Sequence, residues 1–210
     1  MVAGKRISVK GAKNKKYIMQ RKIILASKSP RRIKLLKKAG LNFKAIKPDI
    51  DETFLIRKFK NYSARKLVKF LSLSKAVWVC MNGNLRGDEI IAGFDTVIEF
   101  ENKIIGKPKN EKDALRIIMS LSNKKHKVYT GIGVIDLKKK IVISELEMTK
   151  VLMKKISKVE AKAYIKTKEP MDKAGAYAIQ GRGKKFVKEI SGDYFNVVGL
   201  PLKRFLSMIS

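Results

Sequence analysis

The sequence predicts a globular protein of the α/β or α+β class, and three observations support this prediction. Apolar residues make up 45% of the 210 residues, which is enough for a hydrophobic core and excludes a chain that is disordered throughout. Patterns typical of strands and of helices follow one another along the chain, without an internal repeat. The length suits one large domain or two small lobes that share a cleft.

Boundary residues define the elements that precede residue 90. The apolar run at 23–26 is typical of a short buried strand. Ser29-Pro30 then begins a helix, because serine is a favourable N-cap and proline fits the first helical position, and Gly40 ends it. A second strand is expected at 43–47 and a longer helix at 63–79.

The second half of the chain is expected to contain the long strands of the sheet. Strands are predicted at 90–100, 103–105, 127–137, 140–153 and 185–190. Lys138-Lys139 marks a hairpin turn, and Asn110 and the capping-box pair Ser157 and Glu160 are typical helix N-termini. Helices are therefore predicted at 110–121, at 157–167 and after residue 201.

The balance of charge favours anionic partners. The chain has 49 Lys and Arg against 18 Asp and Glu, a net charge of +31, which attracts nucleotides, nucleic acid or anionic lipid. The lysines are dispersed, as on a solvated surface, except that no acidic residue occurs before Asp49. We predict a flexible basic arm at 1–22 that could contact nucleic acid, and Met19 is an alternative start of the chain.

Rare residue types exclude several classes of protein. No apolar run approaches the ~18 residues of a membrane span, and the single Cys80 excludes an internal disulfide. We therefore expect a cytoplasmic protein. The single His126 excludes a multi-histidine metal site, so a metal would need carboxylate ligands, which favours Mg²⁺ or Mn²⁺. We interpret both Cys80 and His126 as structural.

The first candidate site is Ser27-x-Ser29-Pro30-Arg31-Arg32. Two arginines in the first turn of a helix oppose its dipole, and a bound phosphate chain would offset that repulsion. Two exposed arginines on a basic protein are an equally good explanation.

The second candidate is Asp95, which interrupts the apolar strand at 90–100. Burying a carboxylate there costs several kcal/mol unless it has a partner or a metal. Asp95 is either a catalytic residue or a structural aspartate, and we interpret Gly93 as room for a ligand to approach the backbone.

Three further residues are weaker candidates. Lys75 shares a helical stripe with apolar residues, so its amine either reaches a site or extends past the core into water. Lys107, between a glycine and a proline, is well placed to meet phosphate. Gln180, in a polar stretch with several glycines, can both donate to and accept from a nucleobase edge.

Taken together and in this order, these segments resemble the Maf family of nucleoside triphosphate pyrophosphatases. The matching stretches are LASKSPRRIKLLKKAGLNF, DIDET, LSKA, AGFDTVI, IIGKPKNEKDALRIIMSLSNKKHKVYTG, EPMDKAGAYAIQG and ISGDYFNVVGLPL. The resemblance implies one domain over 23–210 and a homodimer. It also implies a mixed, twisted sheet with flanking helices, related to the inosine triphosphate pyrophosphatases, and a site in a central cleft between two lobes.

The resemblance also implies roles for individual residues. Asp95 falls on the proton acceptor, and Arg31, Thr96 and Gln180 fall on positions associated with substrate choice. We expect Glu52 and Asp95 to hold Mg²⁺ or Mn²⁺ and to activate a water that attacks the α-phosphorus. The residues expected to bind the phosphates are Ser27, Arg31, Arg32, Lys75 and Lys107.

The stretch D-K-A-G-x-Y-x-I-Q-G at 172–181 resembles the branch that hydrolyses dTTP and UTP, which are therefore the expected substrates. Phe94 departs from the small residue that is more common there, and either reshapes the pocket or faces the core. Three alternatives remain: a 7-methyl-GTP pyrophosphatase of the same family, a basic nucleic-acid-binding protein and a homologue without catalytic activity.

Overall fold

The computed structural model describes residues 21–210, and their central element is a seven-stranded mixed sheet with the order β2-β1-β3-β5-β6-β7, in which β4 pairs with β3. β1 lies parallel to β2 and β3, and the remaining pairs are antiparallel. The strands are β1 (Ile23–Ala26), β2 (Phe43–Ile46), β3 (Ile90–Phe100), β4 (Lys103–Ile105), β5 (Lys125–Asp136), β6 (Ile141–Met153) and β7 (Val187–Ser191).

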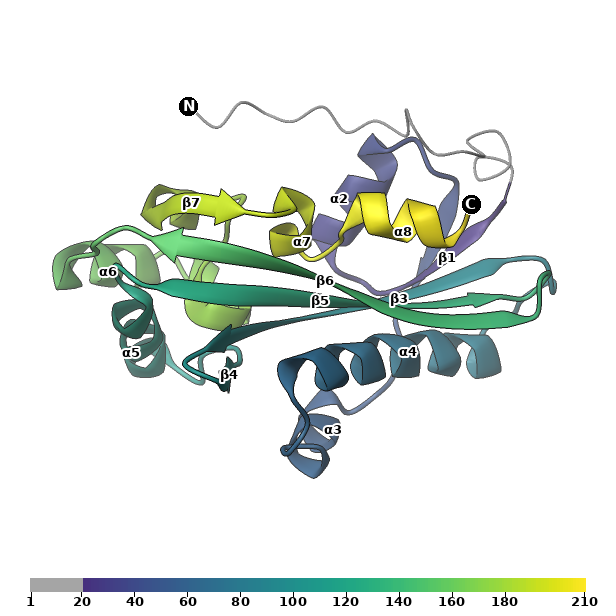
Figure 1. Cartoon of the computed structure of the whole chain (residues 1–210), viewed down its shortest axis with the longest axis horizontal. Coiled ribbons are helices and arrows are strands. Elements are labelled where there is room, and N and C mark those ends of the chain that lie inside the picture. Colours follow the sequence, from purple (N-terminus) through teal and green to yellow (C-terminus); the bar gives the residue numbers. More distant parts are fainter. Residues whose placement is uncertain (1–20) are drawn as a thin grey trace.

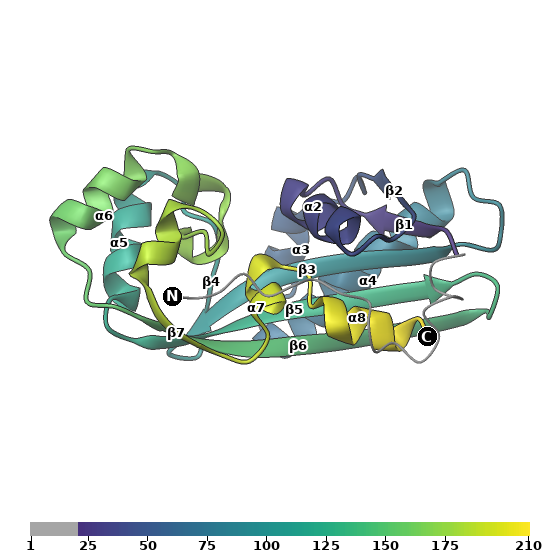
Figure 2. The same cartoon turned by 90° about the horizontal axis from the view of Figure 1, so that it is seen from above.

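Helices cover both faces of this sheet, which confirms the predicted α/β class. Figure 1 shows α3 and α4 on one face and α2, α7 and α8 on the other, and Figure 2 shows α5 and α6 together at one end. The helices are α2 (Pro30–Lys38), α3 (Glu52–Lys58), α4 (Ala64–Asn82), α5 (Glu111–Leu121), α6 (Lys158–Ile165), α7 (Tyr194–Val198) and α8 (Leu202–Met208).

The predicted strands and longer helices are confirmed, and α3, α7 and three 3-10 turns are additional. The capping box of α6 is present, with Ser157 and Glu160 exchanging side-chain and backbone hydrogen bonds. Asn110 caps α5 by accepting from the backbone N–H of Asp113. The 3-10 turns are Glu169–Asp172, Ala174–Ala176 and Arg182–Phe186.

Arg21 lies within the range predicted as an arm, yet it is buried. Its guanidinium binds Asp136 at 2.8 Å between Nη2 and Oδ1, and it donates to the backbone oxygen of Asp88. The folded region therefore includes Arg21. Lys22, the last residue of the predicted arm, also belongs to the folded region, because its backbone oxygen accepts from the N–H of Ile90. Residues 1–20, which include the alternative start at Met19, lie outside the described residues.

The close approach of α4 to the sheet depends on glycines in β3 and β5. A Cβ added at Gly93 would lie 2.1 Å from the backbone oxygen of Ser72, and one at Gly131 would lie 2.0 Å from that of Val68. The interpretation of Gly93 as room for a ligand was wrong, because a helix backbone occupies that space. Phe94 faces the core, and the centroid of its ring lies 5.3 Å from that of Phe205.

Within residues 21–210, each helix is either too short or too polar to cross a bilayer.

Candidate active site

A pocket of about 420 Å³ opens at the carboxyl end of β1. β1 pairs with β3 only as far as Ala26 and Gly93, whereas β3 continues to Phe100, so Asp95 and Thr96 lie two and three residues beyond the last residue of β3 that pairs with β1. Ligands of such sheets commonly bind outside the carboxyl ends of parallel strands. The pocket brings together every predicted site residue: Ser27, Arg31, Arg32, Glu52, Lys75, Asp95, Thr96, Lys107 and Gln180.

Lys75 joins two of the acids that line the pocket. Its side chain crosses from α4, and its Nζ lies 2.6 Å from Oδ1 of Asp95 and 3.0 Å from Oε1 of Glu52. Lys75 is only 5% exposed and Asp95 only 6%. The alternative in which the amine of Lys75 extends into water was therefore wrong, and the buried carboxylate has the partner that its burial requires.

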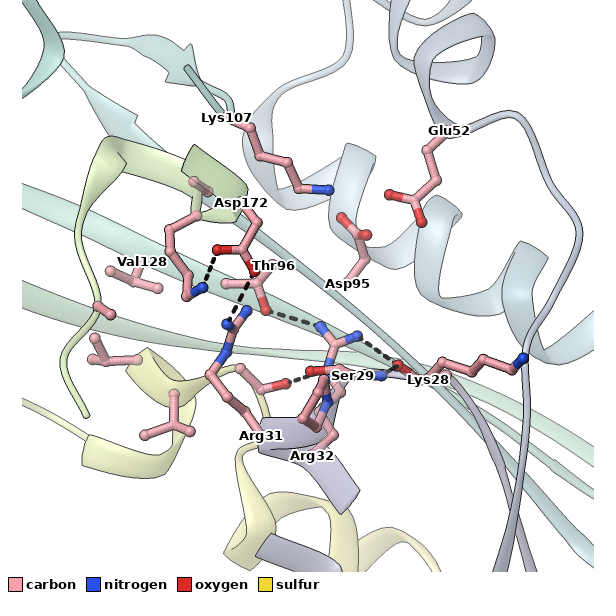
Figure 3. A pocket seen from close by; sticks show the side chains of 18 of the residues that line it. Lys28, Ser29, Arg31, Arg32, Glu52, Asp95, Thr96, Lys107, Val128 and Asp172 are labelled. Atoms are coloured by element: carbon pink, nitrogen blue, oxygen red, sulfur yellow. Dashed lines mark hydrogen bonds and ion pairs between the residues drawn. The ribbon is translucent and has the colours of Figure 1, made fainter. Parts of the chain in front are cut away.

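Glu52 stays ionised because of the cations around it. Burial by itself would raise the pKa of Glu52, but Lys75, with smaller contributions from Lys107 and Arg32, holds this pKa below its ordinary value. Figure 3 shows the side chains of Lys107, Glu52 and Asp95 pointing towards the same part of the pocket.

The two carboxylates fit a divalent ion that is shared with a ligand. No group of three or more His, Cys, Asp and Glu side chains suited to a metal occurs within residues 21–210. Mg²⁺ is commonly held by one or two carboxylates, with substrate phosphates and water as its other ligands. Glu52 and Asp95, which converge on one ammonium group, supply two hard oxygen donors of this kind.

Arg32 is fixed by three neutral oxygen atoms. It donates from Nε to the backbone oxygen of Gly199 at 2.8 Å, and from Nη1 and Nη2 to the hydroxyls of Ser27 and Thr96, each at 3.3 Å. Burial lowers the pKa of Arg32 to about 10, although the charge of Asp95 opposes this effect. The group remains a cation at neutral pH, and no carboxylate forms a salt bridge with it among the described residues.

The N-terminus of α2 faces the same pocket. Ser29 is the N-cap but makes no side-chain cap bond, and the first turn of α2 contains no acidic residue. Ser29 and Arg31 line the cavity, and a helix N-terminus of this kind attracts anions. The predicted conflict between the two arginines and the helix dipole is present in the structure, at a place where a phosphate could relieve it.

Asp172 and Lys173, which were not among the predicted site residues, also line the pocket. Asp172 pairs with Lys173, and its Oδ2 lies 3.8 Å from Nη1 of Arg31 (Figure 3). Partial burial would raise the pKa of Asp172, but these two cations hold it below its ordinary value. Both residues lie in the stretch at 172–181, whose mixture of charges was the available signal.

The pocket as a whole carries an excess of positive charge. Seven cationic side chains and three carboxylates line it, which leaves four positive charges unbalanced. A nucleoside triphosphate carries a similar number of negative charges at neutral pH. The lining residues with charge are Lys28, Arg31, Arg32, Lys47, Lys75, Lys107, Lys173, Glu52, Asp95 and Asp172.

Apolar side chains also line the pocket, and some of them belong to the loop at 177–180. Tyr177 and Ile179 line the cavity next to Gln180, which is exposed. Glu169 supports this loop by accepting hydrogen bonds from the Tyr164 hydroxyl and from two backbone N–H groups. Tyr177 and Ile179 thus contribute uncharged surface to the pocket, beside the amide of Gln180.

His126 and Cys80 do not line the pocket. His126 is buried, and its Nε2 lies 2.8 Å from the hydroxyl of Tyr177. Cys80 is half-buried near the end of α4 and forms no disulfide.

Comparison with known proteins identifies relatives over almost the whole chain. A family model described as Maf-like protein matches residues 22–210. Curated relatives from Clostridium botulinum, Dictyoglomus thermophilum and Bacillus cereus are each named dTTP/UTP pyrophosphatase. They are 45%, 42% and 44% identical to this chain, and the matched regions cover 90%, 91% and 89% of it and 97%, 96% and 93% of the relatives.

Proposed function

The chain belongs to the Maf-like protein family, as the sequence motifs predicted, and we propose that it hydrolyses nucleoside triphosphates to monophosphate and pyrophosphate. The proposed substrates are dTTP and UTP, the nucleotides in the names of its relatives. The observation that carries the proposal is the pocket in which a buried aspartate, Asp95, is surrounded by cations. This arrangement suits chemistry on a polyanion.

Asp95 is the proposed proton acceptor. The water oxygen forms a bond to the α-phosphorus, the bond from this phosphorus to the α,β-bridging oxygen breaks, and pyrophosphate leaves. The proton of the water passes to the carboxylate of Asp95, whose orientation is fixed by its hydrogen bond from Lys75 at 2.6 Å. General base assistance of this kind typically contributes 10²–10⁴-fold in rate.

The cations of the pocket are proposed to stabilise the negative charge that develops during this step. Arg32 is held in place by three hydrogen bonds and still has N–H groups that can bind phosphate oxygens. Arg31 and Lys107 approach from opposite sides (Figure 3). Fixed cations are most effective where charge is greater in the transition state than in the substrate.

Glu52 and Asp95 would together hold Mg²⁺ or Mn²⁺. Such an ion, when bound, would neutralise phosphate charge and lower the pKa of the attacking water. Glu52 is suited to this task because its lowered pKa keeps it ionised.

Nucleotide choice is proposed to depend on Arg31, Thr96 and Gln180. Gln180 lines the pocket, and its amide can pair with a pyrimidine edge that has carbonyl groups and one N–H. We further propose a cytoplasmic location, which suits a nucleotide substrate and the single free cysteine, and a homodimer, as the resemblance implies.

The direct test is pyrophosphate release from a panel of triphosphates, with Mg²⁺, with Mn²⁺ and with EDTA. We expect dTTP and UTP to exceed CTP, ATP, GTP and 7-methyl-GTP in kcat/KM, and we expect EDTA to abolish the activity. Preference for 7-methyl-GTP would contradict the assigned branch. Tight, salt-sensitive RNA binding without release of pyrophosphate would contradict the enzymatic function and favour a nucleic-acid-binding protein.

The Asp95→Asn variant tests the catalytic assignment. It keeps the shape of the side chain but cannot accept the proton of water, so we expect kcat to fall by roughly 10²-fold or more. Asp113→Asn is the matched control, because Asp113 pairs with Arg116 on α5 outside the pocket. Near-normal turnover in a folded Asp95→Asn protein would show that the assignment is wrong.

A further inference from the structure

A chain of hydroxyl groups extends from the pocket into the core. Thr130 is 0% exposed, and its Oγ1 lies 3.1 Å from the backbone oxygen of Asn196. A carbonyl oxygen can only accept, so the hydroxyl of Thr130 is the donor in this contact. Each hydroxyl has a single hydrogen. In its second contact, at 3.0 Å from Oγ1 of Thr96, Thr130 must therefore be the acceptor, and Thr96 donates.

This direction determines what Thr96 presents to the pocket. Its one hydrogen is directed to Thr130, and its oxygen also accepts from Nη2 of Arg32 at 3.3 Å. An oxygen lone pair is what remains for a ligand, and Thr96 lines the cavity. Towards the pocket, Thr96 is an acceptor only.

Ser27 has the opposite polarity on the other side of Arg32. Its Oγ accepts from the backbone N–H of Ser29 at 3.1 Å and from Nη1 of Arg32 at 3.3 Å. These two bonds use the acceptor capacity of the hydroxyl, so its hydrogen is available to donate. Figure 3 shows the guanidinium of Arg32 between Thr96 and the segment of Lys28 and Ser29.

We propose that Thr130 is a positioning residue that fixes Thr96 as a hydrogen-bond acceptor, so that Thr96 binds an N–H or O–H group of the nucleoside. Near pH 7 the α- and β-phosphate oxygens carry no hydrogen, so they have nothing to donate to Thr96 and are excluded from it. Phosphate instead meets the donating hydroxyl of Ser27. Arg32 thus separates a donor side of the pocket from an acceptor side. This inference rests on the proposed function and names the part of the substrate that each side receives.

The backbone carbonyl of Asn196, which accepts from Thr130, is held in place by the side chain of the same residue. Asn196 is buried, and its Nδ2 donates to the backbone oxygen of Val128 and to Oγ1 of Thr149, both at 3.0 Å. Thr149 also donates to the backbone oxygen of Asp193. Because Thr130 is enclosed, it acts on the substrate only through Thr96.

The test compares dTTP with two analogues, one methylated at N3 and one without the 3′ hydroxyl. In the native protein, we expect kcat/KM to fall about tenfold or more for the analogue that lacks the donor bound by Thr96. In Thr130→Val the hydrogen of Thr96 loses its acceptor and turns into the pocket. The preference for dTTP over that analogue should then shrink at least about threefold, mainly through KM.

Two variants separate this effect from a general loss of structure. Thr130→Ser keeps the hydroxyl and should keep the native preference. Ser122→Ala removes a half-buried hydroxyl that bonds the backbone of Ile156, outside both this network and the pocket, so it should lower the melting temperature and leave the preference unchanged. An unchanged preference in folded Thr130→Val, or equal use of all three nucleotides by the native protein, would overturn the inference.

Calorimetric binding of the corresponding monophosphates is measured in the same variants. If the native protein releases no pyrophosphate, the proposed function fails, and these affinities still decide the inference. Loss of discrimination in Thr130→Val would support it, and equal discrimination in the native protein and Thr130→Val would overturn it.

Discussion

His126 is a neutral imidazole that the fold keeps away from water. Burial lowers its pKa to about 4, from an ordinary value of 6.5. Between these two values the unfolded chain binds a proton that the folded protein does not. The free energy of unfolding should therefore fall as the pH falls from 7 towards 4, by about 2 kcal/mol at pH 5.

The chain has a single histidine, so this effect can be isolated. We expect His126→Gln to flatten the dependence of the melting temperature on pH between 7 and 5. The carboxylates with lowered pKa values, such as Glu52 and Asp136, contribute only below their ordinary values of 4.5 and 3.8. An equally steep decline in the variant would show that His126 is not the cause.

Lys75 and Lys107 both lower the pKa of Glu52, and Lys75 contributes more. Lys75→Gln should therefore raise this pKa clearly, and Lys107→Gln should raise it less. Carbon-detected NMR titration of the Glu52 carboxyl group measures both changes. Glu160 is the internal control, because its lowered pKa comes mainly from hydrogen bonds of Ser157. A larger shift in Lys107→Gln than in Lys75→Gln would contradict the observed geometry.

At the scale of elements, the position of Lys75 depends on how closely α4 approaches β3 and β5. A Cβ on Gly131 would lie 2.0 Å from the backbone oxygen of Val68, which cannot move without shifting the helix. We expect Gly131→Ala to cost about 1–3 kcal/mol of stability or more, and to reduce kcat by displacing Lys75 from Asp95.

Gly106→Ala is the matched control for the stability of Gly131→Ala, since an added Cβ at Gly106 meets no atom within 4 Å. Its melting temperature should stay near that of the native protein. Chemical denaturation of both variants measures the difference. Equal stability of the two would mean that α4 does not need the glycine.

Elements with strong local signals could be predicted from the sequence, and those without could not. The bounds of β3 follow from an apolar run that ends at a turn, and those of α6 from a capping box. Residues 52–58, which form α3, contain no buried residue, so no apolar periodicity marks this helix. Its local signals are the N-cap Asp51, which accepts from the backbone N–H of Phe54, and the charges at its two ends, and these are weaker than an apolar stripe.

The site shows the same division. Asp95 stands out because a carboxylate in an apolar strand is costly, and Arg31 and Arg32 because they oppose a helix dipole. The contact of Lys75 with Asp95 depends instead on how α4 crosses the sheet, which local sequence does not encode. The hydroxyl chain through Thr130 is likewise non-local, because β5 brings Thr130 opposite Thr96 of β3.

At the scale of the whole molecule, the net charge of +31 extends the effect of the pocket beyond its contacts. The charged side chains that line the pocket contribute a net four of these charges, and most cations of residues 21–210 do not line it. A field of this sign raises the local concentration of a polyanion, and salt screens it over about 10 Å at 0.1 M.

Raising the ionic strength from about 0.05 to 0.5 M should therefore raise the KM for dTTP roughly threefold to tenfold, with little change in kcat. The double variant Lys162→Glu and Lys166→Glu separates the distant field from direct contacts. Both lysines are exposed, one on α6 and one at its C-cap, and neither lines the pocket. We expect this variant to have a higher KM at low salt and a weaker dependence of KM on salt. If its KM instead equals the native value at every salt concentration, contacts inside the pocket alone determine substrate capture.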